Sequence, residues 1–525
     1  MQYTNPVISG FYPDPSVCRA GDTYYLVCSS FQYFPGVPLF ESTDLLNWKQ
    51  IGHCLTRDSQ IQLDKVTSSG GVFAPTIRYQ DGRFYMTTTN NTTQRNFYVW
   101  TDNIYGEWSE PVIVDQNGID PSLFFEDGKV FFMSTGTDEK GVSGIVQCEI
   151  DIETGRKVTP GRTIWQGSGG RYPEGPHMYK IDGRYYLLAA EGGTEYGHMA
   201  TCARGDSLSG PFEGDPENPV LTNRNLGGYV IQGVGHGDLI EDRDGNWWLI
   251  HLGFRQIGRW LPFHHLGREV FLTPVTFRED GWFDAGRDGT VTACVNTDRI
   301  SETVVQQNKK CYTFENTAWD KDWCYLRLPN MENYMPGEGL LMLRGTQMTL
   351  DQADSPTFIG LRQKEFCAQI SCDVSITGGE AGITLYMDED HHYDLAIRRA
   401  GYGFSVIERL NIGDVKSVEN VADRRQGQHV TQEPDTTLHN PAKVEFRQEN
   451  HASLLIRAEN EYYRFYLVEE SGEVFLGKAR TKYLSSEVAG GFTGVVIGLY
   501  AQDKSAASEA VFTNFRCEYK EMPVI

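Results

Sequence analysis

Three acidic side chains stand in short proline-containing motifs that are far apart in the sequence. Asp14 lies in YPDPS, Asp120 in GIDPS and Glu174 in YPEGP. Proline restricts the backbone and favours a stiff turn, so each carboxyl group is given a defined position. Such turns are also common as purely structural motifs, in which a carboxylate accepts hydrogen bonds from backbone N–H groups. Chemistry therefore depends on whether the fold brings the three groups together.

A repeated hairpin pattern indicates how they meet. A turn followed by an aromatic-rich strand occurs five times, in GDTYYLV, DGRFYMT, DGKVFFM, DGRYYLL and DGNWWLI. The turn aspartates are spaced by roughly 46 to 62 residues, which suits a four-stranded propeller blade with variable loops. We therefore expect an all-β fold with a five-bladed propeller.

The stretch before each hairpin also recurs, as DPSVCRA, APTIRYQ, DPSLFFE, EGPHMYK and HGDLIED. Equivalent strands of a propeller face the central axis in the same way, so their first residues gather there. Asp14, Asp120, Glu174 and His236 are therefore expected to be neighbours in space. Like charges that converge on one axis shift one another's pKa, which proteins mostly tolerate where acid–base chemistry needs it.

Converging carboxyl groups suit the hydrolysis of a glycosidic bond. One carboxylic acid protonates the leaving oxygen, while a second, ionised carboxylate activates water or attacks the sugar. A third can hold the protonated one in place and raise its pKa. This chemistry requires no cofactor and no metal.

Composition narrows the partners and the compartment. The chain of 525 residues has a formal net charge of −23, which disfavours nucleic acid and anionic membranes but leaves a small neutral oligosaccharide unaffected. No apolar run approaches the roughly 18 residues of a membrane helix, and the N-terminus has no signal-peptide pattern. The eleven cysteines include no C-x-x-C pair. They favour free thiols in a reducing compartment, so we expect a cytoplasmic protein.

The second part of the chain has a different pattern. After about residue 300 the hairpin repeat stops, and segments such as AGITLYMD, YDLAIRRA and YYRFYLVE alternate apolar and polar residues between turns. This pattern predicts a β-sandwich of the jelly-roll, concanavalin-like kind. We expect a catalytic propeller over residues 1–300 and the sandwich over 301–525.

The motifs NPVISGFYPDPS, GGVFAPTIRY, GIDPSLFFEDGKVFF, RYPEGPHMYK, GVGHGDL and HHLGREVFLTPV resemble those of glycoside hydrolase family 43. More narrowly, they resemble its two-domain β-xylosidase and α-L-arabinofuranosidase branch. The resemblance implies hydrolysis with inversion. It makes Asp14 the general base that activates water, Asp120 the residue that orients the acid and tunes its pKa, and Glu174 the general acid.

The same resemblance adds substrate-binding residues. Arg268 in LGRE matches an arginine that hydrogen-bonds sugar hydroxyls; the alternative is an ion pair with Glu269 or another nearby acid. Phe31 in SSFQYFPG matches an aromatic wall of the sugar pocket. Phe73 and Ala74 in GVFAP face the leaving-group side, where many relatives have Trp in place of the phenylalanine.

Two further residues are assigned by the resemblance. His236 in GVGHGD matches a histidine near the propeller axis, often close to a calcium ion or a water, and the alternative is a structural core histidine. Any calcium there would be held mainly by water. Phe492 in GGFTG matches a phenylalanine on a sandwich loop that reaches over the active-site mouth, which would favour exo action. Relatives are often dimers or tetramers, so a homo-oligomer is compatible with the resemblance.

Three functions follow from these patterns. The first is an exo-acting, inverting β-xylosidase that releases xylose from the non-reducing ends of xylo-oligosaccharides. The second is an α-L-arabinofuranosidase, or an enzyme with both activities, on the same fold. The third is a propeller that binds carbohydrate or protein without catalysis, against which the intact trio of Asp14, Asp120 and Glu174 argues.

Overall fold

The computed structural model describes all residues except 259, 301–310, 315–319, 401–402, 421–448 and 521–525. The chain divides into two compact units. The first comprises Met1–Leu63, Ser69–Gln256 and Arg268–Asn308, and the second comprises Asp64–Ser68, Ile257–Gly267 and Lys309–Ile525. Two short segments from the first three hundred residues thus belong to the second unit. The sequence had instead predicted two domains that are each contiguous in the chain. The predicted boundary at residue 300 adjoins residues outside the described part.

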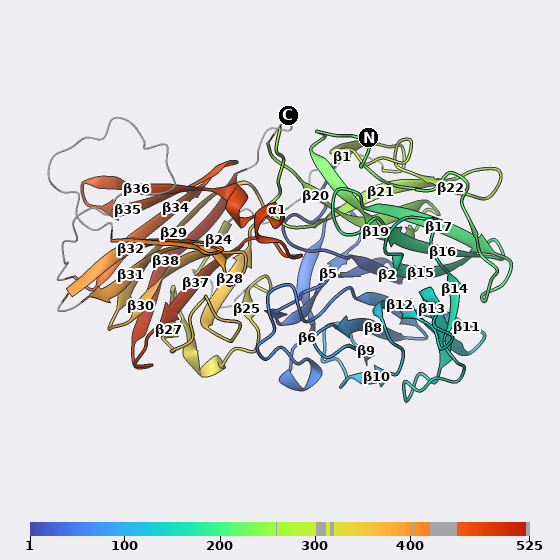
Figure 1. Cartoon of the computed structure of the whole chain (residues 1–525), viewed down its shortest axis with the longest axis horizontal. Helices are drawn as coiled ribbons and strands as arrows, with labels where there is room; N and C mark the ends of the chain where they lie inside the picture. Colours follow the sequence, from blue (N-terminus) through green and yellow to red (C-terminus); the bar gives the residue numbers. More distant parts are fainter. Residues whose placement is uncertain (259, 301–310, 315–319, 401–402, 421–448, 521–525) are drawn as a thin grey trace. The chain divides into compact units, whose positions relative to one another are not determined.

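The first unit is a five-bladed β-propeller, as predicted (Figure 1). Each blade is a four-stranded antiparallel sheet. Blade 1 contains β2 (Ser16–Ala20), β3 (Thr23–Val27), β5 (Gly36–Ser42) and β6 (Lys49–Leu55), and blade 2 contains β7 (Thr76–Gln80), β8 (Arg83–Asn90), β9 (Arg95–Thr101) and β10 (Val112–Val114). Blade 3 contains β11 (Ile119–Glu126), β12 (Lys129–Thr137), β13 (Ser143–Ile150) and β14 (Arg162–Trp165), and blade 4 contains β15 (Glu174–Ile181), β16 (Arg184–Glu191), β17 (Met199–Gly205) and β18 (Glu213–Gly214). Blade 5 contains β19 (Ile231–Glu241), β20 (Trp247–Arg255), β21 (Glu269–Phe277) and β22 (Phe283–Ala285).

The predicted hairpin turns join the first two strands of each blade. At Asp81–Gly82, Asp127–Gly128 and Asp182–Gly183 both turn residues have positive φ. This is the type I′ turn that Asp-Gly favours and that matches the twist of the flanking strands. The first strand of each blade neighbours the first strand of the next, in the ring order β2, β7, β11, β15, β19 and back to β2.

The N-terminal segment closes the ring. Strand β1 (Gln2–Thr4) pairs antiparallel with β23 (Cys294–Asn296), which follows blade 5. The backbone N–H of Val7 donates to the carbonyl of Val270 in β21 at 2.8 Å. The buried Tyr3 hydroxyl donates to the carbonyl of Leu272 at 2.8 Å. Residues at the two ends of the propeller sequence are therefore joined by backbone and side-chain hydrogen bonds.

The second unit is a β-sandwich of two antiparallel sheets. One sheet has the order β26 (Tyr334–Gly337), β27 (Leu340–Arg344), β38 (Glu509–Lys520), β29 (Cys367–Ile376), β34 (His451–Ala458), β35 (Tyr462–Glu469) and β36 (Gly472–Arg480), with β24 (Cys311–Thr313) also paired to β38. The other includes, in order, β33 (Val415–Asn420), β32 (Gly403–Ile412), β31 (His391–Ala400), β30 (Glu380–Tyr386), β37 (Val496–Gln502), β28 (Thr357–Arg362) and β25 (Cys324–Leu326).

Alternation along the strands builds the sandwich core. In β29 buried and half-buried residues alternate without a break, so one face packs inward. Ile370 and Val374 of β29 join Ile383 and Leu385 of β30 in one buried cluster. Each such side chain contributes about 1.5–3 kcal/mol on full burial. The helical elements are short: α1 spans Ser486–Ala489, and single 3₁₀ turns span Asp58–Gln60, Met331–Asn333 and Thr481–Leu484. Within the described part of the chain, no helix is long and apolar enough to cross a membrane.

Candidate active site

A repeated backbone kink marks where the inner strands of the propeller begin. Asp14, Asp120, Gly175 and His236 all have positive φ, between 44° and 58°. For a residue other than glycine this conformation costs on the order of 1–3 kcal/mol, and it is concentrated at functional sites. The sequence repeat aligned Glu174 with this position, whereas the structure puts Gly175 there and Glu174 one residue earlier.

Asp14 is a buried carboxylate surrounded by hydrogen-bond donors. Oδ2 accepts a 2.5 Å hydrogen bond from Ser29 Oγ, and Oδ1 accepts one of 2.6 Å from Nη1 of Arg268. His236 Nδ1 lies 3.8 Å from Oδ1. Burial opposes ionisation, but Arg268, His236 and Ser29 outweigh it and hold the pKa of Asp14 below its usual value. The group is therefore ionised at neutral pH, as a general base must be.

Glu174 and Asp120 form a coupled acidic pair. The backbone N–H of Gly175 donates a 3.1 Å hydrogen bond to Asp120 Oδ2, which ties the two adjacent blades together. Burial, followed by repulsion from Asp14, raises the pKa of Glu174 to about 7. Burial and repulsion from Glu174 and Asp14 also raise the pKa of Asp120. The pair consequently retains a proton at neutral pH that a general acid can deliver.

Arg268 is a buried arginine whose guanidinium lies beside Asp14. Its side chain is buried, and Nη1 also lies 3.3 Å from Thr194 Oγ1. Glu269 forms a bidentate pair with Arg255, with both N–O distances at 2.8 Å. Arg268 thus forms a buried ion pair with Asp14, a nearby acid other than Glu269, and its role in binding sugar stays a prediction.

Aromatic rings line the same region. Phe31 is buried, with its ring centroid 5.4 Å from that of Phe73 and 5.8 Å from that of Phe11. The guanidinium carbon of Arg268 lies 5.8 Å from the centroid of Phe31. Phe73 is half-buried and is followed by the buried Ala74. The structure thus brings Phe31 and Phe73 to the ion pair of Asp14, while their roles in sugar binding stay predictions.

His236 is a buried histidine whose surroundings do not form a direct calcium site. Within the described residues, no group of three or more His, Cys, Asp and Glu side chains could hold a metal ion. Asp238, two residues further along β19, accepts hydrogen bonds from Ser16 Oγ at 2.6 Å and Arg78 Nη1 at 2.8 Å. Its oxygens are thus already bound to donors, and calcium needs six to eight oxygen ligands. A role for His236 through a bound water stays a prediction.

Arg78 fills the space around the propeller axis, which the sequence did not reveal. Its guanidinium contacts both oxygens of Asp238 and lies 2.9 Å from Nδ1 of His177. Tyr179 donates a 2.5 Å hydrogen bond to Asp238 as well. Arg78 occurs in the strand TIRYQ, where a lone arginine resembles a surface residue; its place in an inner strand was the only signal.

Four further residues near the acidic groups were not predicted from the sequence. Ser29 and Thr194 contact Asp14 and Arg268, as described above, and Phe11 packs on Phe31. His198 is fully buried, with Nε2 3.9 Å from Oε1 of Glu174. They lie in loops outside the repeated motifs, so the repeat gave no alignment for them.

Phe492 belongs to the second unit and follows helix α1. The residue is 41% exposed. Its predicted contact with sugar stays a prediction.

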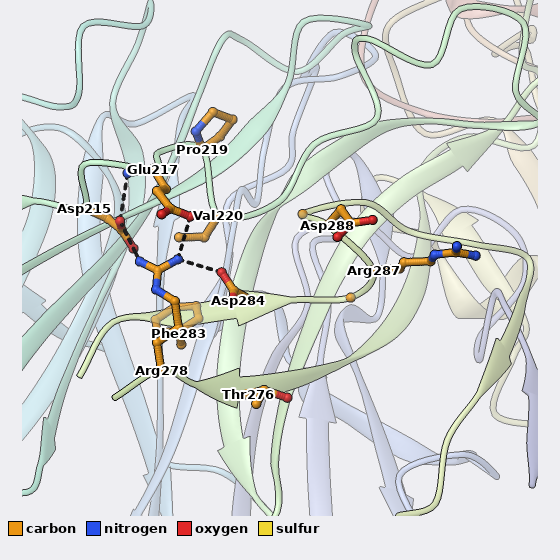
Figure 2. A pocket seen from close by; sticks show the side chains of 12 residues that line it. Asp215, Glu217, Pro219, Val220, Thr276, Arg278, Phe283, Asp284, Arg287 and Asp288 are labelled. Atoms are coloured by element: carbon orange, nitrogen blue, oxygen red, sulfur yellow. Dashed lines mark hydrogen bonds and ion pairs between the residues drawn. The ribbon is translucent and has the colours of Figure 1, made fainter. Parts of the chain in front are cut away.

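A separate cavity of about 630 Å³ in the propeller is lined by several acids but has a structural character. Figure 2 shows the guanidinium of Arg278 on one side of the cavity, hydrogen-bonded to Asp215, Glu217 and Asp284. Arg278 thus forms ion pairs with three of the acids that line the cavity.

Comparison with known proteins decides the family. The family Glycosyl hydrolases family 43 matches residues 3–283, and the Beta xylosidase C-terminal Concanavalin A-like domain matches residues 311–518. The chain belongs to glycoside hydrolase family 43. The family 43 chain is 38% identical to a non-reducing end α-L-arabinofuranosidase of Bacteroides ovatus, over 98% of this chain and 95% of that protein.

Two other proteins that are similar to this family 43 chain are named as a xylosidase/arabinosidase and a xylosidase. A xylosidase/arabinosidase of Butyrivibrio fibrisolvens is 35% identical over 99% of this chain and 98% of its own. The crystal structure of a xylan β-1,4-xylosidase from Bacillus halodurans matches with a TM-score of 0.87 and 30% identity, covering 99% of this chain and all of that one. The chain is therefore a glycoside hydrolase whose relatives act as xylosidases, arabinofuranosidases or both.

Proposed function

We propose that this family 43 hydrolase is an exo-acting, inverting β-xylosidase that releases xylose from the non-reducing ends of xylo-oligosaccharides. The supporting observation is the division of charge among its carboxyl groups. Asp14 is held ionised by Arg268, while the pair of Glu174 and Asp120 retains a proton. A base and an acid are thus present together at neutral pH.

The reaction follows from this division. Asp14 removes a proton from a water as its oxygen attacks the anomeric carbon. Glu174 donates its proton to the glycosidic oxygen as the bond to the leaving sugar breaks. Asp120 accepts a hydrogen bond from the N–H of Gly175, next to Glu174, and is proposed to orient the acid and tune its pKa. The proton taken by Asp14 returns to Glu174 through solvent, which restores the enzyme.

Arg268 has two roles in this proposal. It keeps Asp14 ionised, and its guanidinium presents further donors to sugar hydroxyls beside the ring of Phe31. Phe73 supports stacking on the leaving-group side, with a smaller ring than the tryptophan of many relatives. Phe492 is proposed to contact the sugar from the sandwich unit, and His236 to act through water.

A second candidate is an α-L-arabinofuranosidase, either alone or combined with the first activity. The observation in its favour is the 38% identity over almost the whole chain to the Bacteroides ovatus arabinofuranosidase.

We further propose that the enzyme is cytoplasmic and acts on imported neutral oligosaccharides. Its eleven cysteines are all free thiols, which supports a reducing compartment.

The test is hydrolysis of xylobiose followed by NMR of the anomeric protons from the first minute. We expect α-xylose before mutarotation. β-Xylose appearing first would mean retention and would recast Asp14 as a nucleophile. Comparing kcat/KM for aryl β-D-xyloside and aryl α-L-arabinofuranoside then separates the two candidates, since a preference of more than tenfold for the arabinoside would reverse their order.

A further inference from the structure

His198 is a histidine in the active site for which the proposed reaction has no role. It lies directly before β17, and its side chain is fully buried. Its backbone is fixed on both sides, because its N–H donates to the carbonyl of Glu195 at 3.0 Å and its carbonyl accepts from Thr222 Oγ1 at 2.9 Å. The ring packs against Gly235 of β19, where a Cβ atom would come within 2.8 Å of Nδ1. The ring is therefore closely packed in its place.

The hydrogen-bond pattern fixes the tautomer of this ring. Nδ1 lies 3.3 Å from the carbonyl oxygen of Gly233, which can only accept. Nδ1 must therefore carry the proton. Burial, followed by the positive charges of His236 and Arg268, lowers the pKa of His198 to about 3, so the ring is neutral. Nε2 then has a free lone pair and, within the described structure, no hydrogen-bond partner.

This nitrogen lies close to the proposed general acid. Nε2 lies 3.9 Å from Oε1 of Glu174, whose side chain is 18% exposed. An acceptor at this position favours the protonated carboxyl group, which can donate to it, and disfavours the carboxylate, which cannot. Catalytic hydrogen bonds in ligand-free structures are often long and tighten when substrate binds.

We propose that His198 is a positioning residue that, as a neutral acceptor, holds the acidic proton on Glu174 and directs it. This inference rests on the proposed function of Glu174 as general acid. The other charged groups facing Glu174 are Asp14, Asp120 and Arg268. Of these, the two aspartates favour its protonated form and Arg268 favours the ionised form, and none of the three supplies a neutral acceptor.

The test uses two variants that separate the two ring nitrogens. His198→Asn keeps a donor near the position of Nδ1, and hence the contact with Gly233, but removes the acceptor. His198→Gln retains an amide oxygen near the position of Nε2. In His198→Asn we expect the alkaline limb of the kcat/KM profile to move down by about 0.5–1 pH unit. In His198→Gln we expect the limb to stay within 0.3 unit, roughly the resolution of such a profile.

The leaving group provides a second readout. Xylobiose needs a proton from the general acid, whereas an aryl xyloside with a nitrophenolate leaving group does not. In His198→Asn we expect kcat on xylobiose to fall by about tenfold and on the aryl xyloside by less than about threefold. A limb that moves upward, or equal losses on both substrates, would overturn the inference.

A measurement without turnover separates this inference from the proposed function. In protein labelled with ¹³C at glutamate side-chain carboxyl carbons, the resonance absent from Glu174→Gln reports the titration of Glu174. We expect its midpoint to fall in His198→Asn and to be kept in His198→Gln. An unchanged midpoint in His198→Asn rejects the role of His198, whether or not the wild-type enzyme cleaves xylobiose. Wild-type inactivity on both pentosides, with the midpoint shifted, rejects only the proposed function.

Discussion

Arg268 Nη1 donates a 2.6 Å hydrogen bond to Oδ1 of Asp14, and both side chains are buried. The two residues are 254 positions apart, at the first and last blades of the propeller. The same contact joins the first and last blades and keeps the proposed base ionised. Structure and chemistry are therefore coupled at this ion pair.

Replacing Asp14 tests that coupling. In Asp14→Asn we expect kcat to fall by about 10³-fold or more, because no group remains to accept the proton of water. The melting temperature should also fall, since Arg268 is left buried without its anion. Steady-state kinetics and calorimetry measure both effects. Asp22→Asn, at an exposed turn of the same blade, is the matched control and should change neither.

The pH dependence of kcat/KM should be broad on the acidic side. The pKa of Asp14 lies below its usual 3.8, so the base stays ionised down to about that pH. The pKa of Glu174 is about 7, so the acid is lost as the pH rises through 7. We expect a bell-shaped profile with its alkaline limb near pH 7, governed by the pair of Glu174 and Asp120. An alkaline limb beyond pH 9 would be incompatible with Glu174 as the acid.

The raised pKa of Glu174 should also cost stability. Its folded value of about 7 exceeds the ordinary 4.5, so the folded state is penalised as the pH rises from 4.5 to 7 and remains so above. Glu174→Gln removes this penalty, which is at most about 3 kcal/mol. We expect the variant to melt at a higher temperature than the wild type at pH 8 and at the same temperature at pH 4. Equal melting at both pH values would argue against the raised pKa.

Arg78 should be needed for folding more than for binding sugar. Arg78→Ala leaves Asp238 buried without its cation, which costs about 3–5 kcal/mol. We expect a lower urea midpoint, measured by intrinsic fluorescence. The control is Arg184→Ala, whose pair with Asp206 is largely exposed and is worth at most about 1 kcal/mol. Similar losses in both variants would contradict a special role for the arginine at the axis.

Removal of divalent metal should leave activity unchanged. The guanidinium of Arg78 already supplies the positive charge next to Asp238, and the described acids do not form a metal cluster. We expect kcat within about twofold after dialysis against a chelator, a difference below about 0.5 kcal/mol. A loss that added calcium restores would instead place an ion near His236.

Sequence patterns were sufficient for the blades and for the proximity of the three acidic residues, because both rest on local rules; the catalytic roles of the three stay predictions. Asp-Gly turns and alternating strands specify hairpins, and equivalence between repeats then places Asp14 and Asp120 at one axis. Side chains that interact between blades were not predicted from the sequence. Arg78 contacts His177 and Asp238, which lie 99 and 160 positions away, and His198 contacts Gly233, 35 positions away. Short local windows do not contain that information. The segments 64–68 and 257–267 were missed for the same reason.

The pairing of β1 with β23 also has a consequence for the timing of folding. The hydroxyl of Tyr3 can form its hydrogen bond only after Leu272, 269 residues later, has been synthesised, because the acceptor is the carbonyl oxygen of that residue. At about 5–20 residues per second, a ribosome needs roughly 15–60 s to make that length of chain. The first strand is therefore synthesised long before its partner exists. Sealing of the propeller is a late event in biosynthesis, and slow codons ahead of β23 would prolong the exposure of an unpaired edge.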